Sequence, residues 1–200
     1  MDSASATRHS PPRSFRSARW PVVGVLLVMA ALTAGWPLID QTLDNGEGLR
    51  DGTILELGPA DDIATLRVVG PGWVLSKSAS DPDSAYTLSR DGVELVADYV
   101  DFPGTGGVAE LWTGLRKVQS VADGDSRLGS PRPVISAGGA VGRTGALIRD
   151  GRAGSATVWL PPGRSYAVEV IVLAEPGTGP GPLADATATA RSVSFPGERL

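Results

Sequence analysis

The chain has 200 residues, with 18 basic and 22 acidic side chains, and a formal net charge of −4 at neutral pH. It contains no cysteine, which excludes disulfides and thiolate metal sites. The single histidine, His9, lies in an arginine-rich N-terminal segment. A Ser-His-Asp site or an imidazole zinc site is therefore excluded from everything that follows this segment.

Residues 20–39 form an unbroken run without a charged side chain. A helix of this length spans about 30 Å, which matches the hydrocarbon thickness of a bilayer. Trp20 and Trp36 bracket the run at the depth where indole rings favour the membrane interface. Pro21 suits the first turn of a helix, and Pro37 falls where the helix should end. The run therefore predicts a transmembrane helix, with the lipid bilayer as a binding partner.

Basic residues lie on one side of this run. The arginines Arg8, Arg13, Arg16 and Arg19 precede the run. The acidic residues Asp40 and Asp44 follow it. The positive-inside rule then places the N-terminus in the cytoplasm and the C-terminal part outside, as a single-pass signal anchor in the plasma membrane. A cleaved secretory signal is the alternative, although Leu32 stands where cleavage after Ala34 would need a small residue.

The flanks of the run are polar. Residues 1–19, rich in Ser, Pro and Arg, predict a disordered basic cytoplasmic tail. Residues 40–52 predict a juxtamembrane spacer, and residues 53–200 predict one extracytoplasmic domain. Residues 40–200 carry 14 basic and 21 acidic side chains, a net charge of −7, so this part is a poor candidate for nucleic-acid binding.

Within the domain, short runs with a period of two alternate with turns rich in Gly, Pro and Asp, which is typical of strands. We expect strands at residues 53–57, 64–69, 140–149, 155–160 and 165–174, and a hairpin at 86–102 whose turn is Asp91-Gly92. Apolar residues at helical spacing predict an amphipathic helix at 108–121 and a short helix at 183–193. This order of elements indicates an α+β fold, with helices covering a mainly antiparallel sheet.

Three stretches of the domain resemble the PsbP-like fold: GPGWVLSKSASDPDSAYTLSRDGVELVADYV (70–100), GGAVGRTGALIR (138–149) and ATARSVSF (188–195). The likeness covers about residues 53–196, and it rests on the order of elements, the Gly-Trp entry and the terminal helix. It implies an accessory role, because domains of this kind commonly bind or stabilise protein assemblies. It implies no catalytic residues.

Two glycine-rich or acidic loops imitate known sites. Residues 104–109 (GTGGVA) follow a strand and open a helix, as a phosphate-binding turn does, but the strand belongs to a hairpin rather than to a parallel βαβ unit. Residues 123–126 (DGDS) resemble the start of a calcium loop, but Arg127 occupies the place of the third ligand. We expect ordinary loops at both places, and no metal or cofactor site.

Other candidates for catalysis are also weak. Ser76 and Lys77 are adjacent, so on an extended chain they point to opposite faces. Asp98 and Asp101 are three residues apart on a strand, and we expect solvated charges rather than an acid–base pair. An enzyme that uses only carboxylates would need two carboxyl groups within about 10 Å of each other. The candidates for it are Glu94, Asp98, Asp101 and Glu110.

Six aromatic residues are spread over different elements, where they could pack in the core or line a pocket. They are Trp73, Tyr86, Tyr99, Trp112, Trp159 and Tyr166. We expect packing for most of them, because large rings bury well between a sheet and a helix.

The sequence therefore favours a membrane-anchored, non-enzymatic accessory domain that binds or stabilises another envelope protein. The alternative is a small-ligand sensor or carrier with a pocket between the helix at 108–121 and the sheet. An enzyme that uses only carboxylates is the third hypothesis.

Overall fold

The structure is a computed structural model, and it describes residues 46–59, 62–101, 107–122, 126–161, 163 and 166–196. These residues belong to one compact unit, Asp44–Leu200. No helix within these described ranges is long and apolar enough to cross a bilayer. The predicted tail and the predicted transmembrane helix, with all eight residues named for anchoring and topology, lie outside the described residues.

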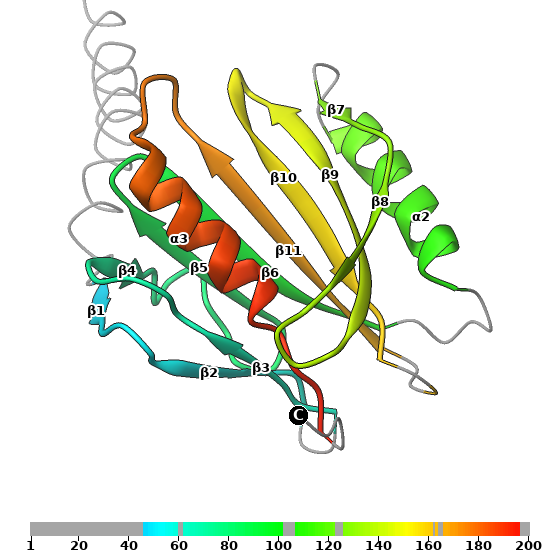
Figure 1. The fold of residues 1–200 in the computed structure, drawn as a ribbon, viewed down its shortest axis with the longest axis horizontal. Helices are drawn as coiled ribbons and strands as arrows, with labels where there is room; N and C mark the ends of the chain where they lie inside the picture. The colour runs from blue at the N-terminus through cyan, green and yellow to red at the C-terminus, as the bar shows by residue number, and fades with distance from the viewer. Residues whose placement is uncertain are drawn as a thin grey trace, which may run out of the picture. The chain divides into compact units, whose positions relative to one another are not determined.

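A nine-stranded antiparallel sheet forms the centre of the described unit (Figure 1). The strands follow the order β1-β4-β5-β6-β11-β10-β9-β7, and β8 also pairs with β9. Their bounds are β1 Glu47–Leu49, β4 Trp73–Leu75, β5 Ala85–Arg90, β6 Val93–Asp101, β7 Arg127–Leu128, β8 Arg132–Ile135, β9 Val141–Arg149, β10 Arg152–Trp159 and β11 Tyr166–Ala174. A separate two-stranded sheet joins β2 (Ile54–Leu57) to β3 (Ala64–Arg67).

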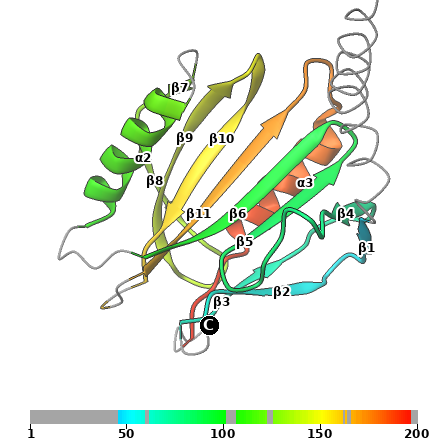
Figure 2. The ribbon, with the colours of Figure 1, turned by 180° about the vertical axis from the view of Figure 1, so that it is seen from behind.

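Two helices lie against opposite faces of the main sheet (Figures 1 and 2). Helix α3 (Pro180–Arg191) contacts β6 and β11, and helix α2 (Val108–Ala122) contacts β7, β9 and β10. Side chains of a strand alternate between its two faces. On β10, Val158 therefore packs with the α2 cluster, whereas its neighbour Trp159 packs with the α3 cluster.

The larger core lies on the α3 side. It contains Trp73, Leu95, Val170 and Phe195, each at most 5% exposed. The indole Nε1 of the buried Trp159 donates a hydrogen bond to the carbonyl oxygen of Ala190 at 3.1 Å, which fixes α3 to the sheet. The small β2–β3 sheet closes the same core, because its residues Leu55, Leu57, Ala64 and Leu66 belong to this cluster.

Most of the elements expected from the sequence are confirmed. The hairpin β5–β6 turns at Asp91 and Gly92, which have φ values of 45° and 77°, as a tight two-residue turn requires. The helix α2 and the antiparallel meander β9–β10–β11 lie where we expected them. Five of the six aromatic residues are buried and Tyr99 is partly buried, so the packing expectation is confirmed for most of them.

The differences concern short strands and one helix end. Strand β1 lies within the stretch expected to be a spacer, and it pairs with β4 in the main sheet. Strands β4, β7 and β8 lie in stretches where we expected no strand. These strands have two to four residues, too few for a period of two to stand out. Helix α3 begins at Pro180, because proline is well suited to the first turn.

Candidate functional site

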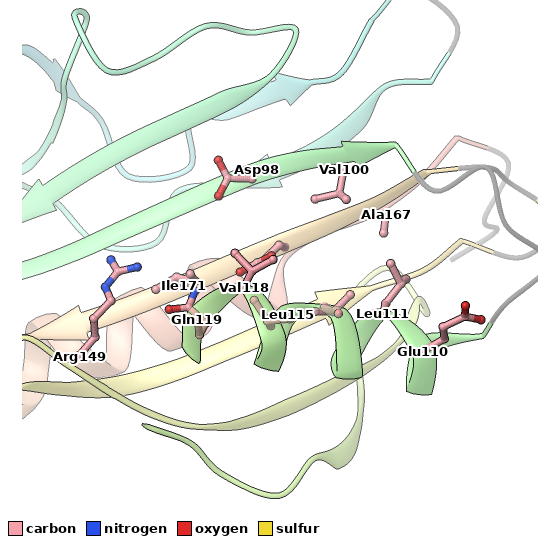
Figure 3. Close-up of a pocket in the computed structure, with 13 residues that line it drawn as sticks. Asp98, Val100, Glu110, Leu111, Leu115, Val118, Gln119, Arg149, Ala167 and Ile171 are labelled. Carbon is pink, nitrogen blue, oxygen red and sulfur yellow. The ribbon is translucent and has the colours of Figure 1, made fainter. Parts of the chain in front are cut away.

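A cavity of about 610 Å³ lies between α2 and the sheet (Figure 3). Helix α2 contacts β7, β9 and β10 but leaves part of β11 and β6 uncovered. The cavity lies beside the helix, over these two strands. We call this cavity the α2 cleft. Its lining residues are Asp98, Val100, Glu110, Leu111, Gly114, Leu115, Val118, Gln119, Arg149, Val158, Ala167, Glu169 and Ile171.

The position of α2 depends on Trp112, which is 2% exposed. Its ring lies directly over Gly145 of β9, where an added Cβ atom would come within 2.8 Å of the indole. Glycine at this position therefore lets the indole reach the sheet. This contact anchors one side of the helix over β9, so that the neighbouring face of α2 borders the cleft.

Most of the cleft wall is apolar. Helix α2 contributes Leu111, Leu115 and Val118, and the strands contribute residues such as Ala167 and Ile171. The side chain of Val118 is 63% exposed, although it lies on the apolar stripe of an amphipathic helix. The apolar face of α2 is therefore only partly covered by the sheet.

Two carboxyl side chains lie together on the strand side of the cleft. Glu169 of β11 and Asp98 of β6 are directly opposite each other in the antiparallel register. Side chains at opposite positions share one face of the sheet, with Cβ atoms about 4.5–5.5 Å apart. Both residues are partly buried, and neither side chain forms a hydrogen bond or a salt bridge with another described residue.

Burial makes both carboxyl groups easier to protonate, and the charge of Asp98 adds to this effect at Glu169. Burial, followed by the charge of Asp98, raises the pKa of Glu169 to about 7, and the nearby Arg149 guanidinium only partly opposes this rise. Burial also raises the pKa of Asp98, again with Arg149 acting in the opposite direction. At neutral pH the cleft therefore holds Glu169 close to the midpoint of its titration.

Arg149 of β9 lies at one end of the cleft, and Glu110 of α2 at the other (Figure 3). The guanidinium of Arg149 approaches the carboxylate of Glu94 at 3.9 Å, and Arg152 binds the same carboxylate at 2.9 Å. The Nε atom of Arg149 is buried and has no hydrogen-bond partner among the described residues. The cleft thus offers a carboxyl pair without a hydrogen bond to another described residue, the further carboxylate of Glu110, and one partly engaged cation.

The structure gathers some of the carboxylates named from the sequence and separates others. Asp98 and Glu110 line the same cleft. Glu94 lies outside the lining set and pairs with the two arginines. Asp101 is exposed and, at an odd spacing from Asp98, lies on the other face of β6, as we expected. Asp98 is partly buried, so the expectation of a solvated charge was wrong for this residue.

The remaining motifs contribute little to the site. Lys77 forms a salt bridge with Glu47 at 3.2 Å, and the hydroxyl of Ser76 contacts that of Ser78 at 3.4 Å, so these two neighbours are engaged elsewhere. Residues 104–106 of the GTGGVA loop and residues 123–125 of the DGDS loop lie outside the described residues. In the described part of the chain, no group of three or more His, Asp or Glu residues could hold a metal ion.

Glu169 and Arg149 were missed by the sequence analysis. A signal for Glu169 was present, because it is the one charged residue in YAVEVIVLA and the one residue of β11 that is not fully buried. A lone charge in the middle of a buried strand points to a functional or paired position. No such signal marks Arg149, which ends its strand before a turn.

Comparisons with known proteins support the architecture. No protein-family model matches the sequence, and no curated protein matches it. The solution structure of cyanobacterial PsbP (CyanoP) from Synechocystis sp. PCC 6803 is similar, with a TM-score of 0.51 and 14% sequence identity. The match covers 77% of this chain and 99% of that chain.

The domain has a PsbP-like fold. This confirms the resemblance inferred from the sequence. At 14% identity the similarity concerns the fold alone, so the chemistry of the α2 cleft rests on its own residues.

Substitution of Glu169 tests the electrostatics of the cleft through stability. Because the pKa of Glu169 is about 7 in the folded protein and 4.5 for an ordinary glutamate, the folded state holds more protons between these values. The free energy of unfolding should therefore fall as the pH rises from 5 to 8, with Glu169 contributing at most about 3 kcal/mol. The variant Glu169→Gln should be more stable than the wild type at pH 8 and show a weaker pH dependence.

Urea unfolding at pH 5 and pH 8 measures this effect. The control is Glu175→Gln, which changes an exposed glutamate just after the same strand. If Glu169→Gln keeps the pH dependence of the wild type, Glu169 does not titrate in a dehydrated site.

Proposed function

We propose that this protein is a membrane-anchored extracytoplasmic domain that binds a small molecule in the α2 cleft. The observation that carries the proposal is a mostly apolar cavity of about 610 Å³ with two carboxyl groups on its wall that form no hydrogen bond with another described residue. Small-molecule sites in proteins typically occupy about 300–1,000 Å³ and combine apolar walls with a few polar groups.

The energetics of the cleft also favour a binding role. Burying a charged group without a partner costs stability, and proteins tend to retain such groups where function needs them. Glu169 lies in the middle of a strand whose other residues are all buried, so an apolar residue there would be the stable choice. A ligand that contacted the carboxyl groups and covered Val118 would supply the missing partners.

The proposed location rests on the sequence. The uncharged run at 20–39 and the arginines before it support a single membrane span with the N-terminus in the cytoplasm. The α2 cleft would then face the extracytoplasmic side. We also propose that the domain binds without catalysis, because the residues after His9 lack the histidine and cysteine on which most acyl-transfer sites depend.

Filling the cleft from Gly114 tests the binding function. This residue lies on the cleft side of α2, and an added Cβ atom there meets nothing within 4 Å. The variant Gly114→Phe should place its ring in the cleft and weaken binding of the neutral probe 4-phenylbutanol at least about tenfold. Titrations of the chain in phosphatidylcholine nanodiscs, followed by NMR of the Ile171 methyl groups, measure the affinity.

The matched control is Gly114→Ala, which leaves the cleft open. It should bind the probe like the wild type and stabilise the helix by about 1 kcal/mol, because alanine favours a helix interior over glycine. Equal binding to Gly114→Phe and Gly114→Ala, or no binding to the wild type, would contradict the proposed site.

A second proposal is the accessory role, in which the domain docks on another envelope protein. Ile135 of β8 and Val141 of β9 are opposite each other in the register, and they are 69% and 56% exposed. Among the described strands, β8 pairs with β9 alone, so its other edge is open to a partner. Exposed apolar pairs beside an open strand edge favour contact with another chain.

Crosslinking in native membranes tests this second role. The variant Ile135→Asp should lose crosslinks to the envelope partner, whereas Ile54→Asp should keep them, because Ile54 is 56% exposed on the separate small sheet. If Ile135→Asp, Ile54→Asp and a form lacking residues 50–200 all crosslink to the same proteins, the domain does not dock through β8.

A further inference from the structure

We infer that the α2 cleft selects small amphipathic amines, with the ammonium group between the carboxyl groups of Asp98 and Glu169 and the apolar body under α2. This inference rests on the proposed small-molecule function and names the chemical class of the ligand. It follows from the geometry of the cleft, in which the free carboxyl groups and the apolar wall occupy one cavity.

The hydrogen-bonding capacity of the carboxyl pair favours an ammonium group. An ionised carboxylate accepts hydrogen bonds and donates none, whereas an alkylammonium group offers three donors. Asp98 and Glu169 form no hydrogen bond with another described residue, so their acceptor positions are available. Charge-assisted hydrogen bonds of this kind are stronger than those between neutral groups.

The other charged groups around the cleft agree with a cationic ligand. Glu110 on α2 adds a further negative charge, and Gln119 on the same helix is neutral. Arg149 on β9 is the positive group of the lining, and it already approaches Glu94. An anionic ligand could reach the Nε atom of Arg149, which has no hydrogen-bond partner among the described residues, but three carboxyl groups line the same cavity.

The apolar walls determine the rest of the ligand. Leu111 and Leu115 of α2 face Ala167 and Ile171 of β11 across the cleft. A hydrocarbon or aromatic body placed between them would be removed from water and would cover the exposed Val118. The ligand class is therefore an amine with one compact apolar group, rather than a polyamine or a sugar.

Amine binding should be linked to pH through Glu169. Its pKa is about 7 in the free protein, because burial and Asp98 disfavour the ionised form against the opposing effect of Arg149. An ammonium group in contact with both carboxyl groups would favour ionised Glu169, so binding at neutral pH would release a proton. The affinity for an amine should therefore increase from pH 6 to pH 8.

Three probes with the same apolar body and different head groups test the inference: 4-phenylbutylamine, 4-phenylbutanol and 4-phenylbutyrate. The chain is titrated in phosphatidylcholine nanodiscs at pH 6 and pH 8, with the Ile171 methyl groups as the reporter. We expect the amine to bind roughly tenfold more tightly than the alcohol at pH 8, as a charge-assisted hydrogen bond would provide. The affinity for the alcohol should not increase from pH 6 to pH 8, because a neutral head group does not favour ionised Glu169.

Matched variants assign the effect to the carboxyl pair. Asp98→Asn and Glu169→Gln should each remove most of the preference for the amine over the alcohol. The control is Asp101→Asn, on the same strand but the opposite face, which should bind all three probes like the wild type.

The outcomes separate this inference from the proposed function. If the alcohol binds in the cleft and the amine binds no more tightly, or if 4-phenylbutyrate binds most tightly, the amine inference is wrong and the binding site remains. If no probe shifts the Ile171 signals, or if Gly114→Phe leaves all three affinities unchanged, the proposed function is wrong as well.

Discussion

The pairing of β6 with β11 is the constraint on which the rest of the structure depends. It runs from Tyr166 opposite Asp101 to Ala174 opposite Val93, and it joins the N-terminal strands β1, β4, β5 and β6 to the C-terminal meander. The two strands are separated in the chain by α2 and four other strands. Their register brings the whole sheet together and also places Glu169 beside Asp98.

The two faces of this strand pair have different roles. On one face, α3 and the small sheet cover Val168, Val170 and Val172, and this apolar burial stabilises the fold. On the other face, Trp112 holds α2 over β9, so part of β6 and β11 remains uncovered. The stability gained on the first face allows the second to keep an unfavourable carboxyl pair.

Local features of the fold could be predicted from the sequence, and long-range ones could not. The hairpin at Asp91-Gly92 and helix α2 depend on turn chemistry and helical spacing within a few residues. The β6–β11 pairing depends on packing between distant segments, so Asp98 looked like an isolated strand charge until Glu169 was found opposite it. A pocket beside α2 was among the expected alternatives, but its carboxyl pair was not.

The most direct test of this account is the titration of Glu169 itself. The carboxyl carbon of a selectively labelled glutamate can be followed by NMR between pH 3 and pH 9, and Glu169→Gln assigns the signal. We expect a midpoint close to pH 7, because the side chain is partly dehydrated beside Asp98. A midpoint near the ordinary value of 4.5 would show a well-solvated carboxylate, and it would contradict the α2 cleft as a dehydrated binding site.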